Sequence, residues 1–145
     1  MKSVRRSLAC GLLAVLLGSS LVANAADTKP ASPVVEDAWI RMLPGDLPAA
    51  GYFALRNRSD AARDLTGTDS PAFAMAMLHR SSEQNGQSQM QHVGTVTLAP
   101  QGTVRFAPRG YHLMLMGAKH PLAVGERVPV TLSFSDGSSV TVEFV

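Results

Sequence analysis

Short β-type runs follow one another from residue 34 to residue 145, with turn residues between them. Asn85-Gly86 and Asp136-Gly137 are strong hairpin signals, because both dipeptides tolerate the left-handed backbone of tight turns. No stretch of this region has the periodicity of an amphipathic helix. The pattern predicts an all-β domain over 34–145, either a β-sandwich or a small barrel. The expected strands are 34–42, 51–57, 73–79, 90–98, 103–106, 111–116, 128–134 and 140–145.

The N-terminal 25 residues have the features of a secretory signal. Three basic residues lie in the first six positions, an apolar run covers 8–17, and Ala23-Asn24-Ala25 has the small-x-small pattern of a cleavage site. The apolar run is too short to span a bilayer, so we expect no stable membrane insertion. We predict a signal peptide over 1–25 cleaved after Ala25, a flexible leader over 26–33, and a periplasmic location.

Cys10 is the only cysteine, and it lies within the predicted signal. It is a poor lipidation match, because the apolar run follows the cysteine instead of preceding it. The exported chain would then have no thiol, which excludes disulfides and thiolate metal ligands. A blue-copper electron carrier is disfavoured for the same reason. Methionine would be the only sulfur left for a soft metal.

Charge and motifs exclude two further function classes. Three of the 13 basic residues belong to the predicted signal, so the remaining chain has ten Lys and Arg against 11 Asp and Glu. This balance gives no basic footprint for nucleic acid. Neither Gly-x-Ser-x-Gly nor His-Glu-x-x-His occurs, and we expect a binding protein and not an enzyme.

Histidine and methionine gather in three of the expected strands, within 75–79, 90–92 and 112–116. Side chains alternate between the two faces of a strand. His112, Met114 and Met116 therefore share one face, opposite a core face formed by the residues between them. The same parity groups Met75 and Met77 with His79, and Met90 with His92. Thioether sulfur is neutral and soft and favours Cu(I), to which imidazole adds a nitrogen donor.

Isolated methionines and histidines have simpler explanations. Met42 lies beside Trp39 and Ile40 and is assigned to packing, since methionine commonly fills gaps between apolar residues. His120 precedes Pro121 in an expected loop and is assigned no function. The role of His92, next to Met90, stays open.

Four of these residues form a spaced pattern. His79, Met90, His112 and Met114 fit H-x10-M-x21-H-x-M. This pattern resembles the signature of the periplasmic copper chaperone family called PCu(A)C. The segments 35–41, 50–57, 110–117 and 128–134 are similar to strands of that family, so the resemblance covers about residues 34–145.

The resemblance implies a cupredoxin-like Greek-key β-sandwich that binds one Cu(I) per chain through His79, Met90, His112 and Met114. It implies a monomer that delivers copper to cytochrome c oxidase assembly. The partner would be a copper acceptor protein, either an oxidase copper-site subunit or another copper chaperone. The chain ends at Val145 without the His/Met-rich tail of some members, so we predict no second, Cu(II) site.

Two alternatives stay open at the level of sequence. A periplasmic copper-sequestering or tolerance protein without a delivery partner would use identical ligands. A β-sandwich protein with an adhesion or scaffold role would bind no metal through these residues. The sequence assigns no role to Met75, Met77 and Met116, and it does not name the copper donor, the acceptor or the affinity.

Overall fold

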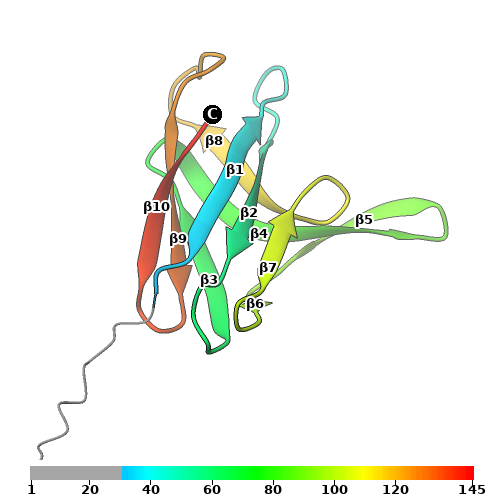
Figure 1. Cartoon of the computed structure of the whole chain (residues 1–145). Coiled ribbons are helices and arrows are strands. Elements are labelled where there is room, and N and C mark those ends of the chain that lie inside the picture. The colour runs from blue at the N-terminus through cyan, green and yellow to red at the C-terminus, as the bar shows by residue number, and fades with distance from the viewer. Residues whose placement is uncertain (1–30) are drawn as a thin grey trace, which may run out of the picture.

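The computed structural model describes residues 31–145, which form ten β-strands arranged in two sheets (Figure 1). The described residues contain no helix that could cross a membrane. The signal peptide predicted for 1–25, with Cys10, lies outside the described residues, as does most of the predicted leader. The strands are β1 (Val34–Arg41), β2 (Ala49–Arg56), β3 (Arg63–Asp69), β4 (Phe73–Gln84), β5 (Gln87–His92), β6 (Val96–Leu98), β7 (Thr103–Phe106), β8 (Tyr111–Ala118), β9 (Val128–Phe134) and β10 (Ser139–Phe144).

The two sheets differ in size. The larger has six strands in the order β1-β2-β7-β8-β4-β5, and the smaller has four in the order β10-β9-β3-β6. β2 pairs with β7 along one half and with β8 along the other. The sheets are joined at one side, where the N–H of Ile40 in β1 donates to the carbonyl oxygen of Val145 at 2.8 Å.

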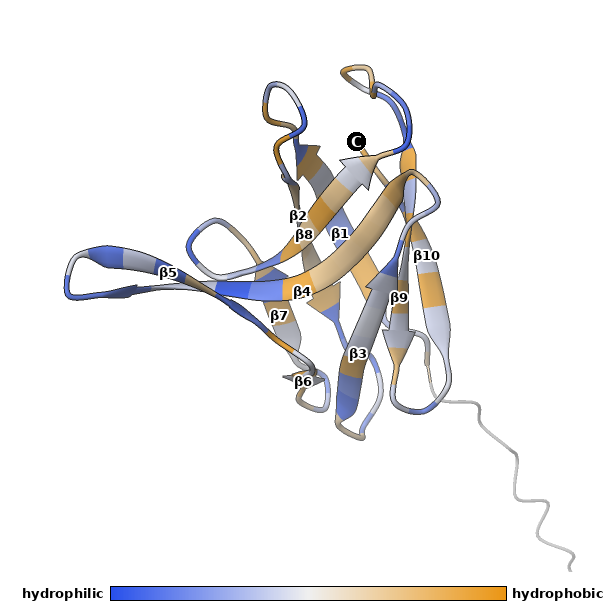
Figure 2. Cartoon of the chain, turned by 180° about the vertical axis from the view of Figure 1, so that it is seen from behind, coloured by the Kyte–Doolittle hydropathy of each residue, from blue (hydrophilic) through white to orange (hydrophobic). Residues whose placement is uncertain are grey.

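Apolar side chains from both sheets fill the space between them. The rings of Phe53 and Phe106 stack with centroids 4.2 Å apart, and Phe144 from the other sheet meets Phe53 edge-on at 5.5 Å. β9 alternates strictly between buried and half-buried residues, as a strand with one core face must. Figure 2 shows apolar residues along the first half of β4 and the middle of β8, and polar residues along the arm formed by the second half of β4 and β5.

Both predicted hairpin turns are confirmed. Asn85 and Gly86 have φ of +53° and +76°, the pair of positive values that a two-residue type I′ turn requires, and they join β4 to β5. Gly137, at φ +80°, lies between β9 and β10. The β4–β5 hairpin projects from the sandwich as an arm (Figure 1), and every residue of β5 is exposed.

The expected strands match the observed ones to within about two residues, apart from three differences. The run 90–98 is not one strand, because the chain leaves the larger sheet after His92 and re-forms as β6 in the smaller one. β3 was not expected, since Arg63–Asp69 is mostly polar and only Leu65 supplies a fully buried apolar side chain. β4 also continues five residues beyond its expected end at His79, to Gln84, directly before the Asn85-Gly86 turn.

Candidate metal centre

The antiparallel register of β4 and β8 determines the face on which each candidate ligand lies. Leu78 is opposite Leu113, and both are buried in the core. Because neighbouring residues point to opposite faces, the alternate residues of both strands lie on the outer face of the sheet. The outer-face pairs are His79 with His112, Met77 with Met114, and Met75 with Met116.

Neighbouring strands extend the histidine pair into a row. On β5, His92 is opposite His79, with ring centroids 5.7 Å apart. The centroids of His79 and His112 are 6.0 Å apart, and Tyr52 of β2 follows at 6.5 Å from His112. Four aromatic rings from four strands therefore lie side by side across the outer face.

The central pair of this row, His79 and His112, supplies two of the four predicted ligands, and the two predicted methionine ligands lie next to this pair. Met114 is two residues from His112 on the same face of β8. Met90 of β5 is opposite Ser81, which is two residues from His79 on the same face of β4. Met90, His112 and Met114 line one open groove of about 460 Å3, and the ring of His79 lies next to that of His112. The fold thus brings together residues from β4, β5 and β8, the three strands from which they were expected.

His112 is held in a single orientation suited to metal binding. Its ring is only 5% exposed, and its Nδ1 lies 3.1 Å from the carbonyl oxygen of Gly110. A carbonyl only accepts, so Nδ1 carries the proton and donates, which leaves the lone pair of Nε2 available. The backbone N–H of Ser81 donates to the same carbonyl at 3.0 Å. Histidine ligands are commonly oriented in this way by a hydrogen bond from the second ring nitrogen.

One ring nitrogen of His79 has no hydrogen-bond partner in the part of the chain that the structure describes. Its Nδ1 is buried and makes no hydrogen bond within residues 31–145. Burial lowers the pKa of His79 below its ordinary value, and the charges of His112 and His92 lower this pKa further. The imidazole is therefore kept neutral, the form that binds metals. A buried ring nitrogen without a partner fits a group that is ligated when a metal is present.

The two predicted sulfur ligands differ in accessibility. Met90 is 56% exposed, whereas Met114 is half-buried beside Ala50. Within residues 31–145, no three His, Cys, Asp or Glu side chains are grouped closely enough to hold a metal ion. A metal at this site would therefore have thioethers among its ligands, a donor set that suits Cu(I) and not the hard cations.

The structure also places the candidates that were left out of the ligand set. His92 lies at the end of the aromatic row. Met77 is directly opposite Met114, and the pair of Met75 and Met116 lies beyond them on the outer face. His120 is in an exposed loop, where its Nε2 is 3.1 Å from a Glu126 carboxylate oxygen. Tyr52 and the Gly110 carbonyl were missed, because only the pairing of β2 and β8 and the turn before β8 bring them to His112.

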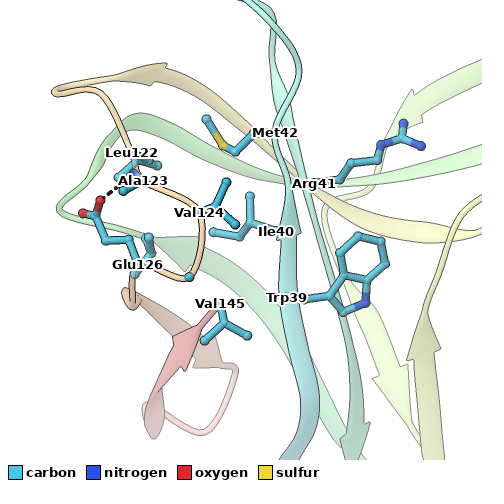
Figure 3. Close-up of a pocket in the computed structure, with 11 residues that line it drawn as sticks. Trp39, Ile40, Arg41, Met42, Leu122, Ala123, Val124, Glu126 and Val145 are labelled. Atoms are coloured by element: carbon cyan, nitrogen blue, oxygen red, sulfur yellow. Dashed lines mark hydrogen bonds between the residues drawn. The ribbon is translucent and has the colours of Figure 1, made fainter.

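A second groove, lined mainly by apolar side chains, lies where the end of β1 meets the loop before β9 and the C-terminus. It has a volume of about 450 Å3, and Figure 3 shows Ile40, Val124 and Val145 around it. Met42 lines this groove at 43% exposure and does not line the groove that contains His112. Met42 was expected to pack and not to bind metal, and it packs at this surface instead of in the core.

Comparison with protein families matches residues 34–145 to the family described as "Putative lipoprotein LpqE-like". The chain belongs to the LpqE-like family. A curated relative, "Putative lipoprotein Lxx21020" of Leifsonia xyli subsp. xyli, is 35% identical over 117 residues. The match covers 74% of this chain and 65% of the relative, so the chain spans about two thirds of that protein's length.

Solved structures share the fold. The copper-bound PCuAC domain from PmoF2 superposes with a TM-score of 0.65 at 24% identity, over 81% of this chain and 93% of that one. The CuI-DR1885 solution structure from Deinococcus radiodurans gives 0.64 at 32% identity, over 84% and 81%. The predicted fold class, an all-β cupredoxin-like sandwich, is confirmed. The assignment of the four ligands stays a prediction.

Proposed function

We propose that the chain is an exported Cu(I)-binding metallochaperone that holds one Cu(I) through His79, Met90, His112 and Met114. The observation that carries the proposal is the pairing of His79 with His112 beside two thioethers on the same sheet face. Within residues 31–145, each of the two imidazoles keeps one ring nitrogen that makes no hydrogen bond. The likeness to PCuAC domains and to CuI-DR1885 supports copper as the ion.

The donor set explains why copper would be preferred to zinc. Zn(II) sites are built from imidazole, carboxylate and thiolate, and thioether is not among their usual ligands. Cu(I) accepts thioether readily. Neither methionine needs to lose a proton, so acid weakens the site only through its histidines. Competition under reducing conditions would overturn the proposal if zinc displaced the copper.

Delivery to an acceptor follows from the ligand strengths. Thiolate is a stronger Cu(I) ligand than thioether, so an acceptor with two reduced cysteines should take the ion. Met90 is exposed, so an incoming thiolate can reach the metal from its side. We propose a subunit of cytochrome c oxidase that carries a copper site, or another copper chaperone, as the acceptor. On this proposal the chain is a monomer and catalyses no reaction.

The test mixes the Cu(I)-loaded protein with a reduced dithiol acceptor of independently measured affinity. The ε-methyl NMR signals of Met90 and Met114 should return to their apo positions as copper leaves. If they stay in the loaded positions although the acceptor binds more tightly, delivery is wrong. The chain is then better explained as a copper-sequestering or tolerance protein with the same ligands.

Export is the second part of the proposal. The family and the relative are both described as lipoproteins, which supports transport out of the cytoplasm. The sequence instead favours a signal peptide that is cleaved after Ala25 and removes Cys10, so that the protein reaches the periplasm without a lipid. A lipoprotein and a protein cleaved after Ala25 would differ in their N-terminal residue and in their mass.

A further inference from the structure

Three methionines on the outer face lie outside the proposed Cu(I) site. Met75 and Met77 belong to β4, and Met116 belongs to β8. Met116 is directly opposite Met75, and Met77 is two residues along β4 from Met75, on the same face. This set, called here the thioether patch, begins one pair beyond the histidine pair.

The spacing allows the three sulfurs to meet. Directly opposite residues of an antiparallel pair have Cβ atoms about 4.5–5.5 Å apart, and diagonal neighbours such as Met77 and Met116 are about 7–8 Å apart. Residues two apart on a strand are separated by roughly 7 Å. A methionine side chain has three rotatable bonds, so its sulfur can cover the remaining distance. All three sulfurs can therefore approach one point above the sheet.

Packing does not account for this set. Met75 is 50% exposed, and Met77 and Met116 are only partly buried, so none of them is a core residue. The residues that fill the core at this point of the two strands are Leu78, Leu113 and Leu115, on the opposite face. Three neighbouring methionines that lie outside the core favour a role that uses the sulfur.

We propose that Met75, Met77 and Met116 form a second soft-metal site, which binds one Cu(I) or the chemically similar Ag(I). Three neutral thioethers select a soft monovalent cation and reject hard cations. The site lacks imidazole, so it fills after the His79–His112 site. Met114 of the first site lies directly opposite Met77 of the patch, so the two sites are adjacent on the outer face. This inference does not depend on delivery by the first site.

The experiment is a Cu(I) titration of the purified protein under reducing conditions, followed through the methionine ε-methyl NMR signals. The first equivalent should shift Met90 and Met114. The second equivalent should shift the three methyls of the thioether patch. Met42, which is similarly exposed but lines the other groove, is the internal control and should not move.

Variants separate the two sites. Met75→Leu/Met77→Leu/Met116→Leu should lose the second equivalent and keep the first, with Met42→Leu as the matched control. His79→Ala/His112→Ala should weaken the first equivalent and leave the patch able to bind. A chain that binds only one equivalent, or a triple variant that still binds two, would overturn this inference. If the first equivalent shifts the patch and leaves Met90 and Met114 unmoved, the proposed function fails and the patch stands.

Discussion

Replacement of Met114 by leucine tests the proposed ligand set most directly. Leucine nearly matches methionine in volume, and Met114 is only half-buried beside Ala50, so the apo fold should tolerate the change. Such swaps usually cost less than about 1.5 kcal/mol. The sulfur, however, is removed from the groove that also contains Met90 and His112.

The expected magnitude comes from the coupling of binding to folding. A ligand buffered at about 100 times its Kd stabilises the native state by about 2.7 kcal/mol. The domain covers residues 34–145. At about 2.1 cal/mol/K per residue, the entropy of unfolding of the whole domain is about 0.24 kcal/mol per degree. Cu(I) should therefore raise the Tm of the unmodified protein by about 11 °C.

The assay is thermal unfolding under reducing conditions, with free Cu(I) set by a competing chelator. Met114→Leu should change the apo Tm by no more than about 6 °C and should lose most of the copper-dependent increase. Met42→Leu is the matched control and should retain the full increase. The assignment is refuted if Met114→Leu keeps the increase, or if Met42→Leu loses it to the same extent.

Three further outcomes are expected. Because burial lowers the pKa of His79 in the folded state, the unfolded chain binds more protons below about pH 6.5, and apo stability should fall as pH falls through this range. Denaturant unfolding at a series of pH values measures this, and His79→Gln should flatten the dependence. Asn57 is fully buried and its side-chain nitrogen donates to the carbonyls of Ala61 and Ala99 at 2.7 and 3.1 Å. Asn57→Ala removes both hydrogen bonds, although the Ala61 carbonyl still accepts from the Ser59 hydroxyl at 2.9 Å and the Ala99 carbonyl from the N–H of Gly102 at 3.0 Å. The loss should cost on the order of 1–3 kcal/mol in urea unfolding, and an unchanged free energy of unfolding would contradict this reading. Intact mass of the exported protein should correspond to a chain that begins at Ala26, and a lipidated Cys10 would show that the signal was misread.

Local sequence was sufficient to predict most of the strands. Residues 103–106 and 128–134 were predicted at their observed bounds, because alternation and flanking turn residues are local properties. β3 was missed because the burial of Arg63 and Leu65 comes from contacts with distant parts of the chain and not from a local sequence pattern. Arg63 pairs with Asp136 at 3.4 Å and lies over the ring of Phe134, contacts that depend on a strand far along the chain.

The ligand candidates were predictable in part for the same reason. Parity within each strand placed His112 and Met114 on one face and grouped Met75 and Met77 with His79, as the structure has them. Parity cannot give the register between strands, and a slip of one residue would reverse the faces. The pairing of His79 with His112 depends on the full β4–β8 ladder, which joins segments more than 30 residues apart. The Tyr52 contact depends in turn on the pairing of β2 with β8.

The exposure of the proposed ligands increases from His112 on β8, through His79 on β4, to Met90 on the edge strand β5. This gradient explains how one site could both hold copper and release it. His112 is buried and fixed by the Gly110 carbonyl, whereas Met90 is 56% exposed on β5, which is the edge strand of the larger sheet next to β4. With the proposed ligand set, an incoming thiolate would meet the metal from the Met90 side and replace the most accessible ligand first. The imidazoles would keep the ion bound during that exchange, because neither ring would need to move for it to begin. The interior of the sheet would thus provide retention, and its edge would provide the route by which copper leaves.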